Sequence, residues 1–195
     1  MKLIKELSKQ ASKQASKQAS KQASKQASKQ AFDPLCDKYK LRRAARAVLF
    51  NSDGEIALMN VKNRGYYKLP GGGVEAGEDT KTALRRECLE EAGAKIEILD
   101  DIGITIEYRD AHELLQISYA FSATILGQLG EPRLDAGESR DGFTLEWHSL
   151  GKAIELVKKS KPTAEKLDNP ERDLYVCDFM IARDTAILEF YRDNF

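Results

Sequence analysis

Several segments of the chain have the hydrophobic content of β-strands, and one of them, Phe143–His148, alternates apolar and polar residues. These segments are rich in β-branched and aromatic residues, which favour strands. The predicted strands span residues 46–50, 55–61, 95–108, 114–126 and 143–148. Between the first two, the run Asn51-Ser-Asp-Gly54 is typical of a hairpin turn. Much of the region from residue 46 to residue 148 is therefore expected to form a sheet.

A helical period replaces this pattern in three other segments. Asp79 can cap a helix that ends before Gly93, because glycine is favoured just after a helix C-terminus. Ser149 can cap a short second helix, and Asn169-Pro170 is typical of the start of a third. Strands come first, with one helix between them and two after them. This order predicts a sheet covered by helices, an α/β (α+β) fold.

The first 31 residues lack both patterns. From Ser8 to Ala31 the unit Ser-Lys-Gln-Ala is repeated six times, and alanine is its only apolar residue. Such a segment cannot bury enough apolar surface to offset the entropy lost on ordering. We therefore expect a basic low-complexity arm over residues 1–31, flexible or marginally helical, followed by one folded domain over residues 32–195. Docking of the lysines on nucleic acid or anionic lipid is the alternative for the arm.

Charge is divided unevenly along the chain. Residues 1–31 hold eight lysines and one glutamate (+7), and residues 32–195 hold 23 basic and 30 acidic residues (−7). An acidic body argues against a nucleic-acid-binding domain. No apolar run approaches the roughly 20 residues of a membrane span, and no secretory signal is recognisable. Three widely spaced cysteines indicate a reducing compartment, so a cytoplasmic location is expected.

The segment that carries chemistry begins with three consecutive glycines, Gly71 to Gly73, followed by the helix after Asp79. On that helix Glu87, Glu90 and Glu91 share one face, because residues three and four apart are neighbours. Carboxylates this close repel one another, and a hard divalent cation such as Mg²⁺ would relieve the repulsion.

Arg86 lies one turn before Glu90 and can hold its carboxylate through a charge-assisted hydrogen bond. The glycine loop can offer backbone groups beside a metal ion. Metal-assisted hydrolysis of a phosphate anhydride needs three groups that this segment can supply. They are a cation that binds phosphates, a backbone cradle, and carboxylates that accept a proton from water.

The 23 residues 72–94 resemble the signature of the Nudix hydrolase family. All seven fixed positions of that signature match here, namely Gly72, Glu78, Arg86, Glu87, Glu90, Glu91 and Gly93. Its two aliphatic positions hold Cys88 and Ala94, which we interpret as a variation in packing. The strand order resembles the family over residues 40–195, and the likeness does not include the repeat arm.

The resemblance implies an α/β/α sandwich with a mixed β-sheet, in which the signature forms a loop–helix–loop. It implies Mg²⁺ or Mn²⁺ ligands and catalytic groups at the matching positions. The metal ligands would be the carbonyl of Gly72 and the side chains of Glu87, Glu90 and Glu91. The catalytic residues would be Glu87, Glu90, Arg86 and Glu138. Among these, Arg86 would orient the glutamates, and Glu138 would be a further carboxylate from a distant loop. Glu78 is expected to close the loop.

The implied reaction is attack of water on the diphosphate bond of a nucleoside diphosphate linked to another group, with ADP-ribose or a nucleotide sugar favoured. Dinucleoside polyphosphates, capped RNA ends and oxidised nucleoside triphosphates stay open as substrates. Two alternatives are a nucleotide-binding sensor without turnover, whose arm docks a partner, and an isomerase of an isoprenoid diphosphate. Dimers are common in the family, so a homodimer is compatible with the resemblance.

Other residues have plainer interpretations. His112 and His148 are expected to be surface or strand residues, and Cys88 a small core residue. Aromatic side chains that could stack on a nucleobase are expected to serve packing instead. They are Tyr66, Tyr67, Phe121 and Trp147.

Overall fold

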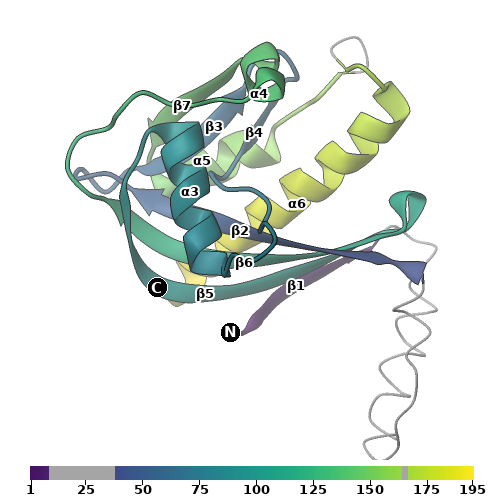
Figure 1. The fold of residues 1–195 in the computed structure, drawn as a ribbon, viewed down its shortest axis with the longest axis horizontal. Coiled ribbons are helices and arrows are strands. Elements are labelled where there is room, and N and C mark those ends of the chain that lie inside the picture. Colours follow the sequence, from purple (N-terminus) through teal and green to yellow (C-terminus); the bar gives the residue numbers. More distant parts are fainter. Residues whose placement is uncertain (9–37, 164–166) are drawn as a thin grey trace, which may run out of the picture.

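A mixed seven-stranded sheet forms the middle of the protein in the computed structural model, which describes residues 1–8, 38–163 and 167–195 (Figure 1). The strand order is β1-β5-β6-β2-β3-β4, and β7 pairs with β3. The pairs β1–β5 and β2–β6 are parallel, and the other pairs are antiparallel. The strands are β1 (Leu3–Ser8), β2 (Lys40–Phe50), β3 (Ile56–Val61), β4 (Tyr66–Lys68), β5 (Ile96–Arg109), β6 (Leu114–Ile125) and β7 (Phe143–His148).

Helices cover both faces of this sheet. The α-helices are α3 (Thr80–Ala92), α4 (Ala136–Asp141), α5 (Leu150–Lys158) and α6 (Pro170–Asn194), and η2 (Asp110–His112) is a 3₁₀ turn. In Figure 1, α3 lies on one face, and α5 and α6 lie on the other. The expected α/β/α sandwich with a mixed sheet is therefore confirmed. Within the residues described, no helix combines the length and apolar character that crossing a membrane requires.

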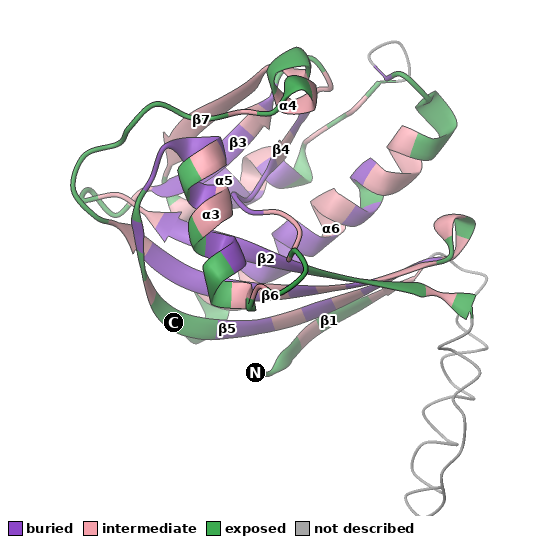
Figure 2. Ribbon diagram, in the orientation of Figure 1, coloured by how far each residue is buried: buried purple, intermediate pink, exposed green. Residues whose placement is uncertain are grey.

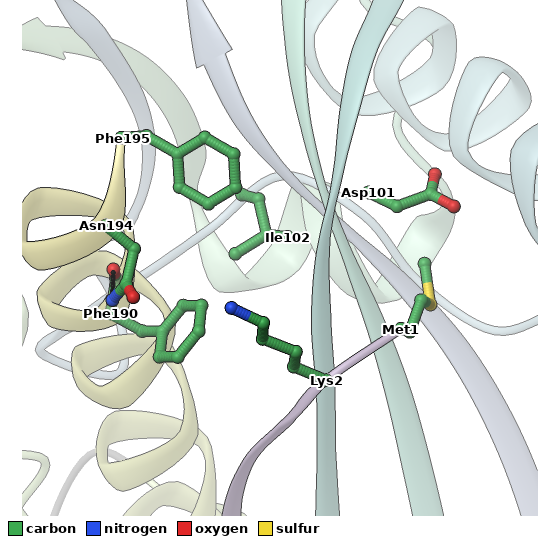
Figure 3. A pocket seen from close by; sticks show the side chains of 7 residues that line it. All are labelled: Met1, Lys2, Asp101, Ile102, Phe190, Asn194 and Phe195. Atoms are coloured by element: carbon green, nitrogen blue, oxygen red, sulfur yellow. Dashed lines mark hydrogen bonds between the residues drawn. The ribbon is translucent and has the colours of Figure 1, made fainter.

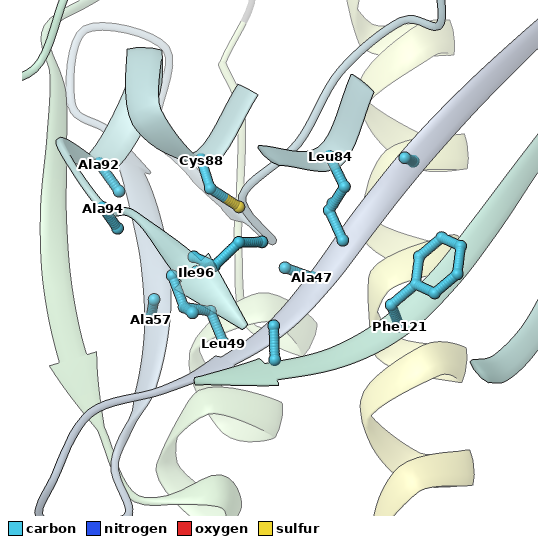
Figure 4. Packing of buried hydrophobic residues seen from close by; sticks show 11 residues of the cluster. Ala47, Leu49, Ala57, Leu84, Cys88, Ala92, Ala94, Ile96 and Phe121 are labelled. Atoms are coloured by element: carbon cyan, nitrogen blue, oxygen red, sulfur yellow. The ribbon is translucent and has the colours of Figure 1, made fainter. Parts of the chain in front are cut away.

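Alternation along β2 divides the core between the two faces, because successive side chains of a strand point in opposite directions. Ala47 and Leu49 pack under α3 against Leu84 and Cys88 (Figure 4). Val48 packs on the opposite side with residues of α5 and α6. The expectation that Cys88 is a core residue is confirmed, since it is completely buried and burial raises the pKa of its thiol. Figure 2 shows buried residues concentrated in the central strands and on the inner faces of the helices.

The local signals read from the sequence are confirmed. Asp79 caps α3 by accepting the Thr82 N–H at 2.7 Å, and Gly93 ends the helix in the left-handed region with φ 63°. The turn between β2 and β3 begins at Asn51, whose side-chain oxygen accepts the N–H groups of Asp53 and Glu55. The two later helices start as expected, with Ser149 and Asn169 as their N-caps.

One predicted strand is longer than expected, and one further strand and one helix were not predicted. Strand β2 begins at Lys40 rather than residue 46, because it pairs residue by residue with β6 from Lys40 to Phe50. Its first half is polar, so hydrophobic patterning does not reveal it. The three-residue strand β4 and the six-residue helix α4 were not predicted either. Both are too short to produce a periodic pattern.

The expectation of a flexible or marginally helical arm over residues 1–31 requires a correction for Leu3–Ser8, which form β1 on the open edge of β5. Pairing satisfies backbone groups that an edge strand otherwise exposes, and Ile4 packs against the core beneath α6. The absence of a side chain at Gly103 allows β1 to approach β5 closely, since a Cβ there would lie 2.6 Å from the Lys2 carbonyl oxygen. The rest of the repeat, and the predicted domain start at residue 32, lie outside the described residues.

Candidate active site

The glycine loop lies directly against β2. The N–H of Ala45 donates to the Gly72 carbonyl oxygen at 2.9 Å, and the N–H of Ala47 donates to the Pro70 carbonyl oxygen at 3.0 Å. Gly71 has φ 124°, and a Cβ there would lie 2.2 Å from the Ala45 carbonyl oxygen. Only glycine fits this approach of two backbone segments. The loop is thereby fixed between β2 and α3.

The carboxylate of Glu87 lies over this loop at Gly72. A Cβ on Gly72 would lie 2.2 Å from Oε2 of Glu87, so the absence of a side chain makes room for the carboxylate. Burial and the negative charge of Glu91 raise the pKa of Glu87. The two carboxylates are therefore close enough to repel each other, as the spacing on the helix predicts.

Arg86 connects the other acidic groups of the signature. Its Nη1 donates to Oε1 of Glu87 at 2.9 Å and to Oε2 of Glu90 at 3.0 Å. Its Nε donates to Oε1 of Glu78 at 2.9 Å, and its Nη2 donates to the Gly73 carbonyl oxygen at 2.9 Å. The hydrogen bond to Glu78 and those to the other two glutamates raise the pKa of Arg86. The predicted contact of Arg86 with Glu90 is confirmed.

Glu78 closes the loop, as the sequence predicts. Its Oε2 accepts the N–H of Glu75 at 3.0 Å, and both of its oxygens accept from Arg86. The hydrogen bond from Arg86 lowers the pKa of Glu78. The carboxylate is therefore held ionised, tied to the loop and to α3.

Glu91 is held from β4 by Lys68, a residue that sequence analysis missed. Nζ of Lys68 lies 2.5 Å from Oε1 of Glu91, and the N–H of Gly71 donates to Oε2 at 2.9 Å. Glu91 is 2% exposed and Lys68 is 8% exposed. The only sequence signal was a lysine next to the loop in Tyr-Tyr-Lys-Leu-Pro-Gly, where strand alternation places its side chain on the buried face of β4 beside Tyr66.

A buried ion pair on α6 holds the start of the loop, and sequence analysis missed it too. The N–H of Leu69 donates to Oδ2 of Asp184 at 3.0 Å, and Nε of Arg183 donates to Oδ1 of Asp184 at 2.7 Å. Both charged residues are completely buried. Asp184 lies one turn from Ile181 and one turn from Leu188, so a carboxylate on the apolar face of α6 was the available signal.

Glu138, the candidate from a distant loop, lies in the first turn of α4. It forms a reciprocal capping box with Asp135, whose N–H donates to Oε2 of Glu138 at 2.9 Å. Burial and the negative charge of Glu91 raise the pKa of Glu138, and the Asp135 N–H and Lys68 oppose this. The fold thus brings Glu138 within electrostatic range of Glu91 and Lys68, although more than 40 residues separate it from either.

The candidate metal ligands are carboxylate and carbonyl oxygens, which suit a hard divalent cation. Burial and charge repulsion raise the pKa of Glu87, and a bound cation would relieve both effects. In residues 1–8, 38–163 and 167–195, no group of three His, Cys, Asp or Glu side chains is arranged as a metal site. In the structure the carboxylates of Glu87 and Glu90 turn toward Arg86. The carboxylate of Glu91 turns toward Lys68 and the Gly71 N–H. The carbonyl oxygen of Gly72 has a second acceptor position beyond its bond to Ala45.

A hollow of about 400 Å³ lies elsewhere, between β1 and the end of α6 (Figure 3). It is lined by Met1, Lys2, Asp101, Ile102, Phe190, Asn194 and Phe195. None of the signature residues borders it. We therefore locate the candidate site at the glycine loop and α3. Of the aromatic residues considered for stacking, Tyr66 and Phe121 are buried in the core, as expected.

Two neighbouring glycines allow a matched test of the loop. In Gly72→Ala the three atoms nearest to the new methyl group all belong to the carboxylate of Glu87, the movable end of that side chain. We expect a loss of activity of about tenfold or more with a small change in Tm, because a 1 Å misplacement in an active site has effects of this size. In Gly71→Ala the methyl group meets the backbone of β2 at a positive φ, and we expect a clear loss of stability. Thermal unfolding and turnover of both variants check this. Equal Tm losses in both would contradict it.

The comparisons with known proteins agree with this geometry. The sequence model of the NUDIX domain matches residues 40–168. Diphosphoinositol polyphosphate phosphohydrolase 2 of Rattus norvegicus is 29% identical over 136 residues, which cover 68% of this chain and 72% of that protein. Diphosphoinositol polyphosphate phosphohydrolase 3-alpha of Homo sapiens is 28% identical over 136 residues, which cover 68% of this chain and 79% of that protein.

Solved structures show the same fold. The MutT protein from Methanosarcina mazei Go1 has a TM-score of 0.50 at 19% identity, covering 80% of this chain and 97% of that one. A NUDIX hydrolase from Nitrosomonas europaea has a TM-score of 0.50 at 20% identity, covering 74% of this chain and 92% of that one. Since the family match spans most of the chain and includes the loop and α3, the protein belongs to the Nudix hydrolase family.

Proposed function

We propose that this protein catalyses the Mg²⁺-dependent hydrolysis of a diphosphate bond, with Mn²⁺ able to replace Mg²⁺. The observation that supports this most directly is the arrangement of Glu87, Glu90 and Glu91 on α3 beside the glycine loop. Carboxylate oxygens are the ligands that Mg²⁺ prefers, and Mg²⁺ also binds substrate phosphates. We assign the three glutamates and the Gly72 carbonyl oxygen as the cation ligands. The bound cation would neutralise phosphate charge and promote ionisation of water.

The surrounding residues would orient this site. Arg86 holds Glu87 and Glu90 in fixed positions, and Lys68 together with the Gly71 N–H does the same for Glu91. We propose Glu138 as the carboxylate that accepts a proton from the attacking water. Its raised pKa favours this role, because a general base works best when its pKa lies near the working pH.

Two substrate classes follow from different observations. The signature favours a nucleoside diphosphate linked to another group, of the ADP-ribose or nucleotide-sugar type. The names of the relatives favour a second class, the diphosphoinositol polyphosphates. In both classes water attacks one phosphorus of a diphosphate bond, and the other phosphate leaves.

One kinetic screen tests the function and separates the classes. The protein is incubated with Mg²⁺ and, in turn, ADP-ribose, a nucleotide sugar, a dinucleoside polyphosphate and a diphosphoinositol polyphosphate. In ¹⁸O-labelled water, we expect one product to gain a single ¹⁸O atom on a phosphate. Tight binding of a nucleotide without hydrolysis of any compound would instead support the sensor alternative and would overturn the proposed reaction.

A further inference from the structure

A group of buried charged residues lies beside the glycine loop, on the face of β2 that is turned toward α6. It contains three arginines and two carboxylates, all at most 6% exposed. They are Arg46, Arg109 and Arg183, with Glu107 and Asp184. Positive charge is therefore in excess inside the protein. A buried charge is costly unless it has a partner.

The two carboxylates are already used by two of the arginines. Arg109 donates to Oε2 of Glu107 at 2.6 Å from Nη2, and Arg183 donates to Oδ1 of Asp184 at 2.7 Å from Nε. Arg183 also lies 3.5 Å from Glu107. Arg46 is left over. In the described part of the chain no ion pair joins it to a carboxylate, and its Nη1 donates only to the Ala45 carbonyl oxygen at 2.9 Å.

Arg46 has in addition a buried donor without an acceptor. Its Nε has no hydrogen-bond partner among the described residues, although Arg46 is only 4% exposed. Burial and the positive charge of Arg183 lower the pKa of Arg46 to about 9. A protein rarely keeps an unsatisfied buried donor, and each such group calls for an explanation. An anionic ligand is a partner that would satisfy it.

The position of the arginines points to the same ligand. A Cβ built on Gly71 would lie 3.1 Å from Cα of Arg46, and one built on Gly73 would lie 3.3 Å from Nη2 of Arg42. The backbone of Arg46 and the guanidinium group of Arg42 therefore border the glycine loop, and the carboxylate of Glu87 on α3 lies over the same loop. Arg42 is four residues before Arg46 on the same face of β2, and it is exposed. Its Nη1 donates to the amide oxygen of Gln116 at 2.5 Å, with no carboxylate partner in the ranges described.

We propose that Arg42 and Arg46 form an anion subsite beside the glycine loop, which binds a phosphate group of the substrate other than the two joined by the cleaved bond. Arg42 marks the open end of the subsite and Arg46 its buried end. Arginine suits this task because its planar guanidinium group matches the oxygens of a phosphate. The inference rests on the proposed function, and it narrows the substrate to diphosphates that carry at least one further phosphate group.

The test compares two ligands that water cannot cleave, in the presence of Mg²⁺. One is methylenediphosphonate, and the other is the bis-methylene analogue of tripolyphosphate, which has one more phosphorus group. By calorimetry, we expect the wild-type protein to bind the longer analogue about tenfold more tightly or better, since a hydrogen bond between charged groups is worth at least this factor. In Arg46→Met this preference should disappear. In Arg43→Met it should persist, because Arg43 is exposed and alternates onto the other face of β2.

Thermal unfolding separates this role from a purely structural one. Without ligand, Arg46→Met should unfold at the same temperature as the wild type or higher, because it removes an unpaired buried charge. A clear fall in Tm would mean that Arg46 stabilises the fold, and the proposal would then be wrong. Equal affinity of the wild type for both analogues, or binding of neither, would also overturn it. Failure of the hydrolysis screen is a separate result, since a protein that prefers the longer analogue without turnover refutes only the reaction.

Discussion

Replacing Glu87 with Gln is expected to lower kcat by about 10³-fold while leaving the fold intact. The variant keeps the size of the side chain but removes the charge that lies over Gly72. Loss of a ligand that stabilises charge in the transition state costs several kcal/mol, which corresponds to this factor. Stability should not fall. Burial and the charge of Glu91 already raise the pKa of Glu87 in the folded protein, so its ionised form opposes folding at neutral pH.

The measurement is turnover at saturating substrate and Mg²⁺, together with Tm without metal. Glu97→Gln is the matched control, because Glu97 is an exposed residue of β5 away from the loop. The control should keep full activity. A Glu87→Gln protein with less than a tenfold loss in kcat would show that Glu87 is not a main ligand. A Tm well below that of the wild type would show that its charge serves the fold instead.

The elements with strong periodic patterns were predictable from the sequence. Helix α3 was predicted with its N-cap at Asp79 and its C-terminal glycine at position 93, since these signals are local. The contact between Arg86 and Glu90 was predictable for the same reason, because residues four apart on a helix are neighbours. The assignment of Glu78 to loop closure came instead from the resemblance to the family signature.

The parts that escaped prediction depend on contacts between distant segments. Lys68 meets Glu91 across 23 residues, and Asp184 meets the N–H of Leu69 across 115 residues. The hydrophobic periodicity of a sequence gives no information about contacts between residues so far apart. Strand β1 also depends on a contact between distant segments, because it pairs in parallel with β5, about 100 residues later in the chain. Its apolar side chains alone bury too little surface to predict order; the open edge of β5 supplies the rest.

Replacing Asp184 with Ala is expected to lower the free energy of unfolding by about 3–5 kcal/mol, the usual cost of breaking a buried ion pair. The guanidinium group of Arg183 would lose its main partner in a place with no access to water. The N–H of Leu69 would lose its acceptor at the start of the glycine loop. For a chain of this size the Tm should fall by roughly 10 °C. Urea unfolding and calorimetry give the two quantities.

Asp193→Ala is the control on the same helix, since Asp193 is exposed and, within the described residues, its ion pair is with its neighbour Arg192. It should leave Tm nearly unchanged, because exposed ion pairs contribute little. Asp184→Asn adds a second comparison: its amide oxygen can still accept from Leu69, so it should be more stable than Asp184→Ala. Leu69 leads directly into the glycine loop, which contacts the carboxylates of Glu87 and Glu91 on α3. Asp184→Asn should therefore also lower kcat more than Asp193→Ala does. Equal stability of Asp184→Ala and Asp193→Ala would mean that the buried pair does not hold the loop in place.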